Sequence, residues 1–164
     1  MHEAVRDYVC QFGTLAPVSV LDIGGRDLNG RVSGFWPNAR YTSLDLLPGK
    51  NVDIVADATC WDPVELTGFW DIVLCCEVFE HVEKWREIVR TAWLAVRDNG
   101  GRVIFTCAGE GRAPHSGIEA TAITPGEYYG NVTADELRAA MEGVGFKDIE
   151  CAQVGLDLQA TAIG

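Results

Sequence analysis

Val18-Ser-Val-Leu-Asp-Ile-Gly-Gly25 is a short apolar run that closes on two consecutive glycines. A run of this length followed by a glycine turn is typical of a buried strand. Four similar apolar runs follow along the chain, at 41–46, 52–56, 69–76 and 102–107. The sequence therefore predicts a series of buried strands, and the segments between them decide how those strands pair.

Helical patterns alternate with these strands. Trp85, Ile88, Val89 and Ala92 recur at helical spacing within 82–97, and Thr133-Ala-Asp-Glu136 has the form of a capping box that opens another helix. Such alternation favours parallel pairing with helices on both faces of the sheet. Further expected elements are a helix over 2–13, a helical stub over 30–35, a cap at Asn99-Gly100-Gly101, a helix from 133 to 143 or 145, and closing strands over 146–154 and 156–163.

We therefore predict an α/β fold. It is doubly wound and Rossmann-like, with a mostly parallel seven-stranded sheet, an antiparallel edge strand, and helices on both faces. The length of 164 residues fits a single domain over 1–164, with no separate substrate domain. Only Gly155 separates the last two strands, so we expect them to pair as an antiparallel hairpin at one edge.

Composition narrows the function classes. The formal net charge of −11 disfavours an extended phosphate backbone as partner, although Arg26, Arg31, Arg40 and Arg112 are candidates for a local basic rim. No apolar run approaches the roughly 20 residues needed to span a bilayer, and no secretory signal is visible. The six cysteines form no C-x-x-C pair, and we interpret them as reduced and mostly buried, which favours the cytoplasm.

Acidic residues mark the ends of the first three expected strands. They are Asp22, Asp45 and Asp57, and the fourth strand is followed by Glu77. In an open parallel sheet, ligands bind beyond the carboxyl ends of the strands. Asp45 lies 21 residues after Gly24, a separation at which an acid can accept hydrogen bonds from ribose hydroxyls. The pattern predicts a nucleoside ligand without phosphate.

A dinucleotide site is the usual competitor, and it requires G-x-G-x-x-G around a pyrophosphate. Here Arg26 and Asn29 stand where the later glycines would be, and Asp22 and Asp27 would place negative charge near the phosphates. The G-x-x-x-x-G-K-[ST] phosphate loop is absent as well. The cationic sulfonium and ammonium groups of S-adenosylmethionine (SAM), in contrast, are attracted by acids.

The chain resembles the class I SAM-dependent methyltransferases. Val20-Leu-Asp-Ile-Gly-Gly25 is similar to their first motif, and Thr42-Ser-Leu-Asp-Leu46 to their second. Val55-Ala-Asp-Ala58 resembles the motif that contacts adenine, and Phe69–Val82 the family stretch "fD-hydrophobic run-EvlEHv". Two later segments also match, Asn99–Ile104 and Thr133–Phe146. One departure is Arg26, which replaces the second glycine of the first motif.

The resemblance implies SAM as cofactor, with S-adenosylhomocysteine (SAH) as product. Asp45 is expected to bind the ribose and Asp57 the adenine amine, while Gly24 and Gly25 allow the backbone to approach the ligand. Asp22 is expected to contact the methionine part, although it also fits a helix or turn cap. The cofactor-binding set is Asp22, Gly24, Gly25, Arg26, Asp45, Leu46, Asp57, Ala58, Cys76 and Glu77.

Catalytic candidates follow the fourth strand and occupy the long segment 108–132. His81 and His115 are the candidate catalytic residues, but Glu80 and His81 also fit a cap of the following helix, and His115 also fits an ordinary loop residue. Tyr128 and Tyr129 are candidate acceptor contacts, or anchors of the loop. No metal site is expected.

The hypothesis is methyl transfer to a small-molecule acceptor, at a site that is open or is completed by the 108–132 loop or by another subunit. A nucleic-acid methyltransferase is one alternative, although the (D/N)PPY-type motif is missing after the fourth strand, where Cys76-Glu-Val-Phe79 stands. The other alternative is a SAM-binding module without catalytic activity.

Overall fold

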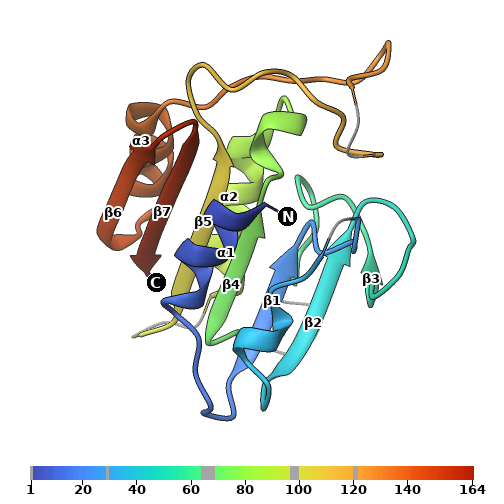
Figure 1. Cartoon of the computed structure of the whole chain (residues 1–164). Coiled ribbons are helices and arrows are strands. Elements are labelled where there is room, and N and C mark those ends of the chain that lie inside the picture. Colours follow the sequence, from blue (N-terminus) through green and yellow to red (C-terminus); the bar gives the residue numbers. More distant parts are fainter. Residues whose placement is uncertain (1, 29, 64–68, 97–99, 120–121) are drawn as a thin grey trace.

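The computed structural model describes residues 2–28, 30–63, 69–96, 100–119 and 122–164. Seven strands form one sheet in the order β3-β2-β1-β4-β5-β7-β6, with β1 through β5 parallel and β7 antiparallel to both of its neighbours (Figure 1). The predicted fold class is confirmed. The strands are β1 (Ser19–Ile23), β2 (Arg40–Asp45), β3 (Ile54–Val55), β4 (Ile72–Cys76), β5 (Arg102–Ala108), β6 (Lys147–Val154) and β7 (Asp157–Ile163).

The order of the strands reverses between β1 and β4. From β1 the chain proceeds outward through β2 to β3, and it then returns to the other side of β1 to form β4 and β5. This reversal creates a crevice beyond the carboxyl ends of the two central strands, which is where ligands bind in such sheets.

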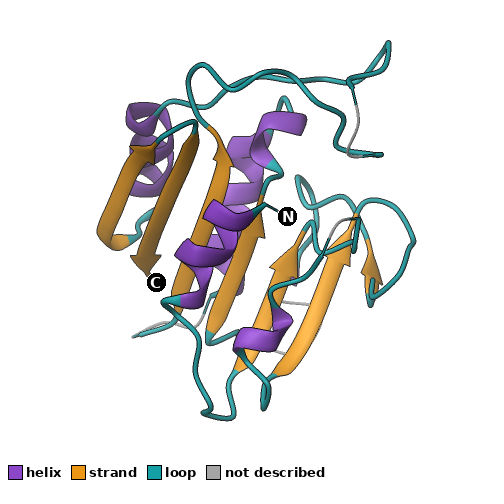
Figure 2. Ribbon diagram, viewed as in Figure 1, coloured by secondary structure: helices purple, strands orange, loops and turns teal. Residues whose placement is uncertain are grey.

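Helices cover both faces of the sheet (Figure 2). The helix α1 (Glu3–Cys10) lies on one face, where its Val5 and Val9 share a core with Val20 of β1. The helices α2 (Trp85–Ala95) and α3 (Ala134–Val144) lie on the other face, over a core that includes Leu21 and Ile23. Successive residues of a strand point to opposite faces, so β1 supplies both cores.

The closing part of the chain follows the prediction closely. Thr133 accepts a hydrogen bond from the backbone N–H of Glu136, whose carboxylate accepts one from the backbone N–H of Thr133, so the capping box is confirmed. Gly145 ends α3 with φ +110°, in the left-handed region that favours glycine. The strands β6 and β7 pair as the expected antiparallel hairpin.

Several elements are shorter than predicted. The third strand is only Ile54–Val55, and the stub expected at 30–35 is a 3-10 helix, η1 (Ser33–Phe35). The helix expected from 82 begins at Trp85, because a separate 3-10 helix, η3 (Phe79–His81), precedes it. The same helix ends before Val96, which pairs with Trp70 in an isolated β-bridge. Part of that predicted helix and the proposed cap residue Asn99 fall outside the described residues.

Cysteine burial is mixed. Cys75, Cys76 and Cys107 are buried in the sheet, Cys151 is half-buried, and Cys10 and Cys60 are exposed, all as free thiols. The expectation of mostly buried cysteines therefore holds for the strand positions only. Among the described residues, no helix combines the length and apolar character that crossing a bilayer requires.

Candidate functional site

A cavity of about 840 Å³ opens beyond the carboxyl ends of β1, β2 and β4. Its volume lies within the range of roughly 300–1,000 Å³ that is typical of small-molecule sites. The described residues of the segment 108–132 pass over this end of the sheet (Figure 1), and some of them line the cavity. The cavity thus occupies the strand-order reversal where the sequence placed the site.

The turn after β1 packs so closely against neighbouring side chains that it requires glycine. Gly24 has φ +79°, and a Cβ added there would lie 2.2 Å from Cγ2 of Val78, which follows β4. A Cβ on Gly25 would lie 2.0 Å from the Ser43 hydroxyl oxygen. Only glycine fits at either position without displacing a neighbour. Gly24 lines the cavity, whereas Gly25 does not, because it packs against β2.

The backbone donors of this turn are already engaged. The N–H groups of Gly24 and Gly25 donate to the Leu44 carbonyl at 2.8 and 3.1 Å, and that of Arg26 donates to Asp45 at 3.3 Å. The described residues between 24 and 32 form no α-helix. A pyrophosphate site needs free N–H donors at a helix N-terminus, so this geometry agrees with a ligand that lacks phosphate.

Asp45 and Asp57 both face the cavity. Asp45 accepts hydrogen bonds from the backbone N–H groups of Leu47 (3.0 Å) and Arg26, and Asp57 accepts from the backbone N–H and the hydroxyl of Thr59, at 2.8 and 2.7 Å. These bonds hold each carboxylate in a fixed orientation. Each oxygen keeps further lone-pair capacity for a ligand donor. Leu46 and Ala58 lie beside them and add apolar lining.

Asp22 lies outside the cavity lining, unlike the other two strand-end acids. Its side chain is buried, and its Oδ2 accepts a hydrogen bond of 2.7 Å from the Tyr41 hydroxyl. Burial raises its pKa to about 6 despite that hydrogen bond and the nearby Arg31. Strand alternation is the reason, because it directs Asp22 toward the α1 face together with Val20. Asp22 is therefore hydrogen-bonded to Tyr41 within the protein and lies outside the cavity lining, and its expected contact with the methionine part of the ligand stays a prediction.

Arg26 takes the position of the missing glycine and lines the cavity. Its Nε lies 3.8 Å from Oδ1 of Asp45, and its NH2 group donates to the Ile118 carbonyl at 3.1 Å. The side chain therefore links the turn after β1 to the segment 108–132. The resemblance to known motifs did not indicate this bridging role.

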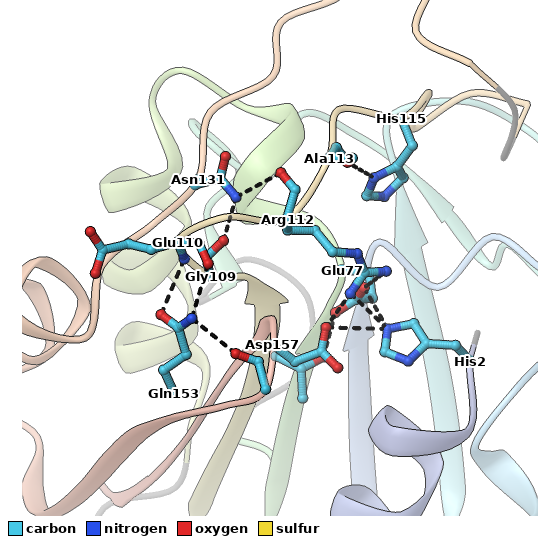
Figure 3. Close-up of polar contacts among 12 residues, drawn as sticks. His2, Glu77, Gly109, Glu110, Arg112, Ala113, His115, Asn131, Gln153 and Asp157 are labelled. Carbon is cyan, nitrogen blue, oxygen red and sulfur yellow. Dashed lines mark hydrogen bonds and ion pairs between the residues drawn. The ribbon is translucent and has the colours of Figure 1, made fainter.

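Cys76 and Glu77 end β4 and line the cavity. Burial raises the pKa of the Cys76 thiol, which is therefore neutral. The backbone of Glu77 has φ +59°. The Glu77 carboxylate forms ion pairs with His2 (3.1 Å) and Arg112 (3.7 Å). Asp157 pairs with the same Arg112 and completes this cluster (Figure 3). Burial alone would raise the pKa of Glu77, but the hydrogen bond with His2 and the charges of His2 and Arg112 outweigh it and lower the pKa.

Glu80 and His81 do not cap the helix that follows. Lys84 occupies the N-cap position of α2 without a side-chain cap, while Glu80 is fully buried in η3 and His81 lines the cavity. Burial, with a smaller contribution from the Glu77 charge, raises the pKa of Glu80 to about 8. The backbone N–H groups of Glu80 and Ala108 and the charge of Arg112 oppose this rise in pKa, although neither side-chain oxygen of Glu80 makes a hydrogen bond of normal geometry.

The two candidate catalytic histidines lie together. The rings of His81 and His115 meet edge to face, with centroids 4.9 Å apart, and both line the cavity. Burial and the neighbouring His115 lower the pKa of His81 to about 4, so this imidazole is neutral at pH 7. Gly117 of the loop packs against His81, since a Cβ there would lie 2.7 Å from its ring.

The two tyrosines of the loop differ. Tyr128 is exposed and lines the cavity, in agreement with an acceptor contact. Tyr129 does not line it and packs edge to face against His81 and His115, with its hydroxyl buried and unpartnered. The packing of Tyr129 therefore fits the anchor alternative, and its contact with an acceptor stays a prediction.

Sequence reasoning missed two features of the site. It treated Arg112 only as a possible rim charge, and it did not anticipate the burial of Glu80. A basic residue inside a glycine-rich segment that crosses acidic strand ends was an available signal for Arg112. Nothing local distinguishes Glu80 from an exposed acid, because its burial depends on how the distant segment 108–132 packs.

Comparisons with known proteins agree with this geometry. The chain superimposes on human N-acetylserotonin methyltransferase in complex with SAM with a TM-score of 0.64, at 14% identity, covering 96% of this chain and 51% of that chain. For the methyltransferase SibL the TM-score is 0.68, at 19% identity, with 96% and 54% covered. For DhpI in complex with SAH it is 0.60, at 19% identity, with 88% and 75% covered.

At these identities the similarity shows the fold alone, and the chain spans about half the length of the first two structures. A search of curated proteins found no match. The family model described as "Methyltransferase domain" matches residues 1–151, which is most of the chain. The chain therefore belongs to this methyltransferase domain family.

Proposed function

We propose that the chain is a SAM-dependent methyltransferase that acts on a small-molecule acceptor. SAM would carry the methyl group on a sulfonium, which makes that group open to nucleophilic attack. Asp45 would accept hydrogen bonds from the ribose hydroxyls, and Asp57 from the adenine amine. Leu46 and Ala58 would flank the adenine, and Gly24 would let the ligand approach the backbone.

One observation carries the proposal. Asp45 and Asp57 face one cavity beside a glycine turn whose N–H donors are already engaged. That combination suits a nucleoside whose hydroxyls and amine donate hydrogen bonds, and it does not suit a phosphate. The cavity is also lined by five carboxylates (Asp45, Asp57, Glu77, Glu83, Glu127) against three basic side chains (Arg26, Lys84, Arg112), a balance that favours a cationic ligand.

The family and the structural neighbours support the same proposal. The domain model describes a methyltransferase, and neighbours with the same fold hold SAM or SAH. Two neighbours are named for small-molecule substrates, human N-acetylserotonin methyltransferase and Haemonchus contortus phosphoethanolamine N-methyltransferase 2. The negative charge of the chain agrees with a small or cationic acceptor rather than an extended nucleic acid.

The acceptor would enter at the end of the cavity that is lined by His81, His115 and Tyr128. The segment 108–132 covers this end, and its packing onto His81 and its link through Arg26 to Asp45 hold it close to the strand ends. Such a cover excludes water and aligns the acceptor with the methyl group. The chain's own contribution would therefore be mainly positioning.

Calorimetric titration with SAH tests the cofactor site. We expect wild-type protein to bind SAH, and Asp45→Ala to weaken binding by about 1–3 kcal/mol, the usual cost of removing a partner from buried polar groups. Asp7→Ala is the matched control, because Asp7 is an exposed acid on α1 outside the cavity lining. Preferential binding of NAD, or equal SAH affinity in Asp45→Ala and wild type, would contradict the proposal.

Transfer of a labelled methyl group from SAM to a cell extract tests the activity. We expect label in the small-molecule fraction, with a loss in the Asp45→Ala variant. Label that is released by nuclease treatment would instead indicate a nucleic-acid methyltransferase. SAH binding without transfer to any fraction would indicate a binding module.

A further inference from the structure

Glu80, His81 and His115 bring three potential metal-binding groups together. One ligand atom from each of the three side chains lies within 4.8 Å of the others. Glu80 and His81 come from η3, directly after β4, whereas His115 comes from the segment 108–132. The cluster therefore forms only when that segment packs over the strand ends.

The carboxylate of Glu80 lacks a partner. The residue is fully buried, and neither of its side-chain oxygens has a hydrogen-bond partner. Within the described part of the chain, no lysine or arginine forms an ion pair with it. A buried carboxyl group without a partner is costly, and native structures rarely keep one without a reason such as a bound ion or an ordered water.

Other unpartnered atoms lie around Glu80. Seven buried side-chain nitrogen or oxygen atoms of the described residues lack a hydrogen-bond partner, and four of them belong to Glu80, His81 and Tyr129. The Tyr129 ring lies 5.5 Å from that of His81 and 5.2 Å from that of His115. The unmet hydrogen-bonding capacity is thus concentrated at one place.

The two imidazoles are oriented for ligation. Nδ1 of His115 lies 3.3 Å from the Ala113 carbonyl oxygen (Figure 3). A carbonyl can only accept, so Nδ1 carries the proton of this bond and Nε2 keeps its lone pair. Metal-binding histidines commonly make such a bond through the other ring nitrogen. Nδ1 of His81 is buried without a partner, so it too has a free position.

A second cluster in the chain provides a contrast. His2, Glu77 and Asp157 also lie within ligand distance of one another. There Arg112 already pairs with both carboxylates, so positive charge is present and a cation would be repelled (Figure 3). No such guanidinium is paired with Glu80 in the described residues.

We propose that Glu80, His81 and His115 bind a divalent transition-metal ion. Two imidazoles and one carboxylate are ligands that suit ions such as Zn²⁺, Mn²⁺ and Co²⁺. His81 and His115 line the cavity, so the remaining coordination positions would face the acceptor end. The sequence predicted no metal site, because Glu80-His81 resembled a helix cap and His115 lies 34 residues further along.

Such an ion would also indicate which chemical class of acceptor the site takes, an inference that rests on the proposed function. A divalent cation binds an acceptor oxygen and lowers its pKa, which favours a hydroxyl-bearing acceptor. The hydroxyl proton would pass to water and the oxygen would form the bond to the methyl carbon. The carbon–sulfur bond would break, leaving its electron pair on sulfur.

Titration of the chelator-treated full chain with Co²⁺ tests the site through the visible absorption of the bound ion. We expect one ion per chain, and binding at least about tenfold weaker in His115→Ala and in Glu80→Gln. His115 is a half-buried loop residue, so its substitution leaves the core intact. His2→Ala is the matched control, because it removes the only other histidine of the chain, and we expect it to bind Co²⁺ as wild type does.

Three outcomes would overturn the proposal: no spectral change at millimolar Co²⁺, wild-type affinity in His115→Ala, or loss of binding in His2→Ala, which would assign the ion to the second cluster. SAH titration of the same samples separates the two proposals. Co²⁺ binding without SAH binding would support the metal site and contradict the proposed function. SAH binding without Co²⁺ binding would support the proposed function and contradict the metal site.

Discussion

The two ends of the cavity satisfy their polar groups in opposite ways. At the aspartate end, formed by Gly24, Asp45 and Asp57, the carboxylates accept hydrogen bonds from nearby backbone N–H groups. At the histidine end, formed by Glu80, His81 and His115, the buried carboxylate and one imidazole nitrogen have no partner. The aspartate end is thus fixed by bonds within the protein, whereas the histidine end keeps polar atoms that the proposed ion would bind.

The largest expected effect on stability lies at Gly24 of the aspartate end. Gly24 contacts Val78, so Gly24→Ala adds a side-chain clash to an unfavourable backbone conformation. We expect the free energy of unfolding to fall by about 2–5 kcal/mol in urea denaturation, from roughly 1–2 for the backbone and 1–3 for overpacking. Gly155→Ala is the control, since its φ is +64° but no atom lies within 4 Å of an added Cβ. Equal losses in the two variants would show that the contact with Val78 is unimportant.

A pH effect arises behind the aspartate end, at Asp22. Its folded-state pKa of about 6 lies above the ordinary value of 3.8, mainly because of burial, while Tyr41 and Arg31 lower it and Asp45 raises it. As the pH rises from 3 to 7, the unfolded carboxyl ionises first, so this group makes the free energy of unfolding fall by about 3 kcal/mol, of which about 2 kcal/mol is lost between pH 4 and 6. Above pH 7 the loss is complete and constant.

Denaturation of wild type and Asp22→Asn across this pH range checks the effect. The asparagine keeps an acceptor for the Tyr41 hydroxyl and cannot ionise, so the stability difference between the two proteins should change by about 3 kcal/mol between pH 3 and 7. If the stabilities of the two proteins change with pH in the same way, Asp22 does not carry the raised pKa.

At the histidine end, removal of the buried polar group of Glu80 should stabilise the protein. Glu80→Met replaces the unpartnered carboxylate by an apolar side chain of similar length. We expect the chelator-treated variant to be more stable than chelator-treated wild type by about 1–3 kcal/mol, because a desolvated polar group is removed. Thermal unfolding with and without Co²⁺ checks this, and the variant should not be stabilised by the ion. A destabilised variant would mean that Glu80 has a partner in the folded chain.

The sequence predicted the aspartate end better than the histidine end, for a physical reason. Asp45 and Asp57 directly follow apolar strands, and parallel strands bring their carboxyl ends to one edge, so local pattern was enough. Asp22 was misplaced because the same reasoning ignored strand alternation, which turns it toward Tyr41. His115 and Tyr129, which pack around His81, lie more than 30 residues further along the chain, and local pattern holds no information about how that segment packs.

The smallest expected effect concerns Arg26, which connects the aspartate end to the loop that builds the histidine end. Its contact with Asp45 is long, at 3.8 Å, and its bond to the Ile118 carbonyl is a single hydrogen bond to an exposed segment. Arg26→Ala should therefore weaken SAH binding by less than about 1 kcal/mol. The larger consequence should be dynamic, because loss of the link frees the loop, and amide hydrogen exchange around 116–119 should accelerate.

Arg86→Ala is the control, since Arg86 pairs with Glu136 on the surface, away from the cavity. Faster exchange in Arg26→Ala but not in Arg86→Ala, together with weaker Co²⁺ binding, would show that the two ends are coupled through this side chain. Unchanged hydrogen exchange with weaker SAH binding would show that Arg26 affects the aspartate end and does not affect the loop. The histidine end would then be held by other contacts of the loop, among them the packing of Gly117 and Tyr129 on His81 and the hydrogen bond from the Gly130 N–H to the Glu80 carbonyl.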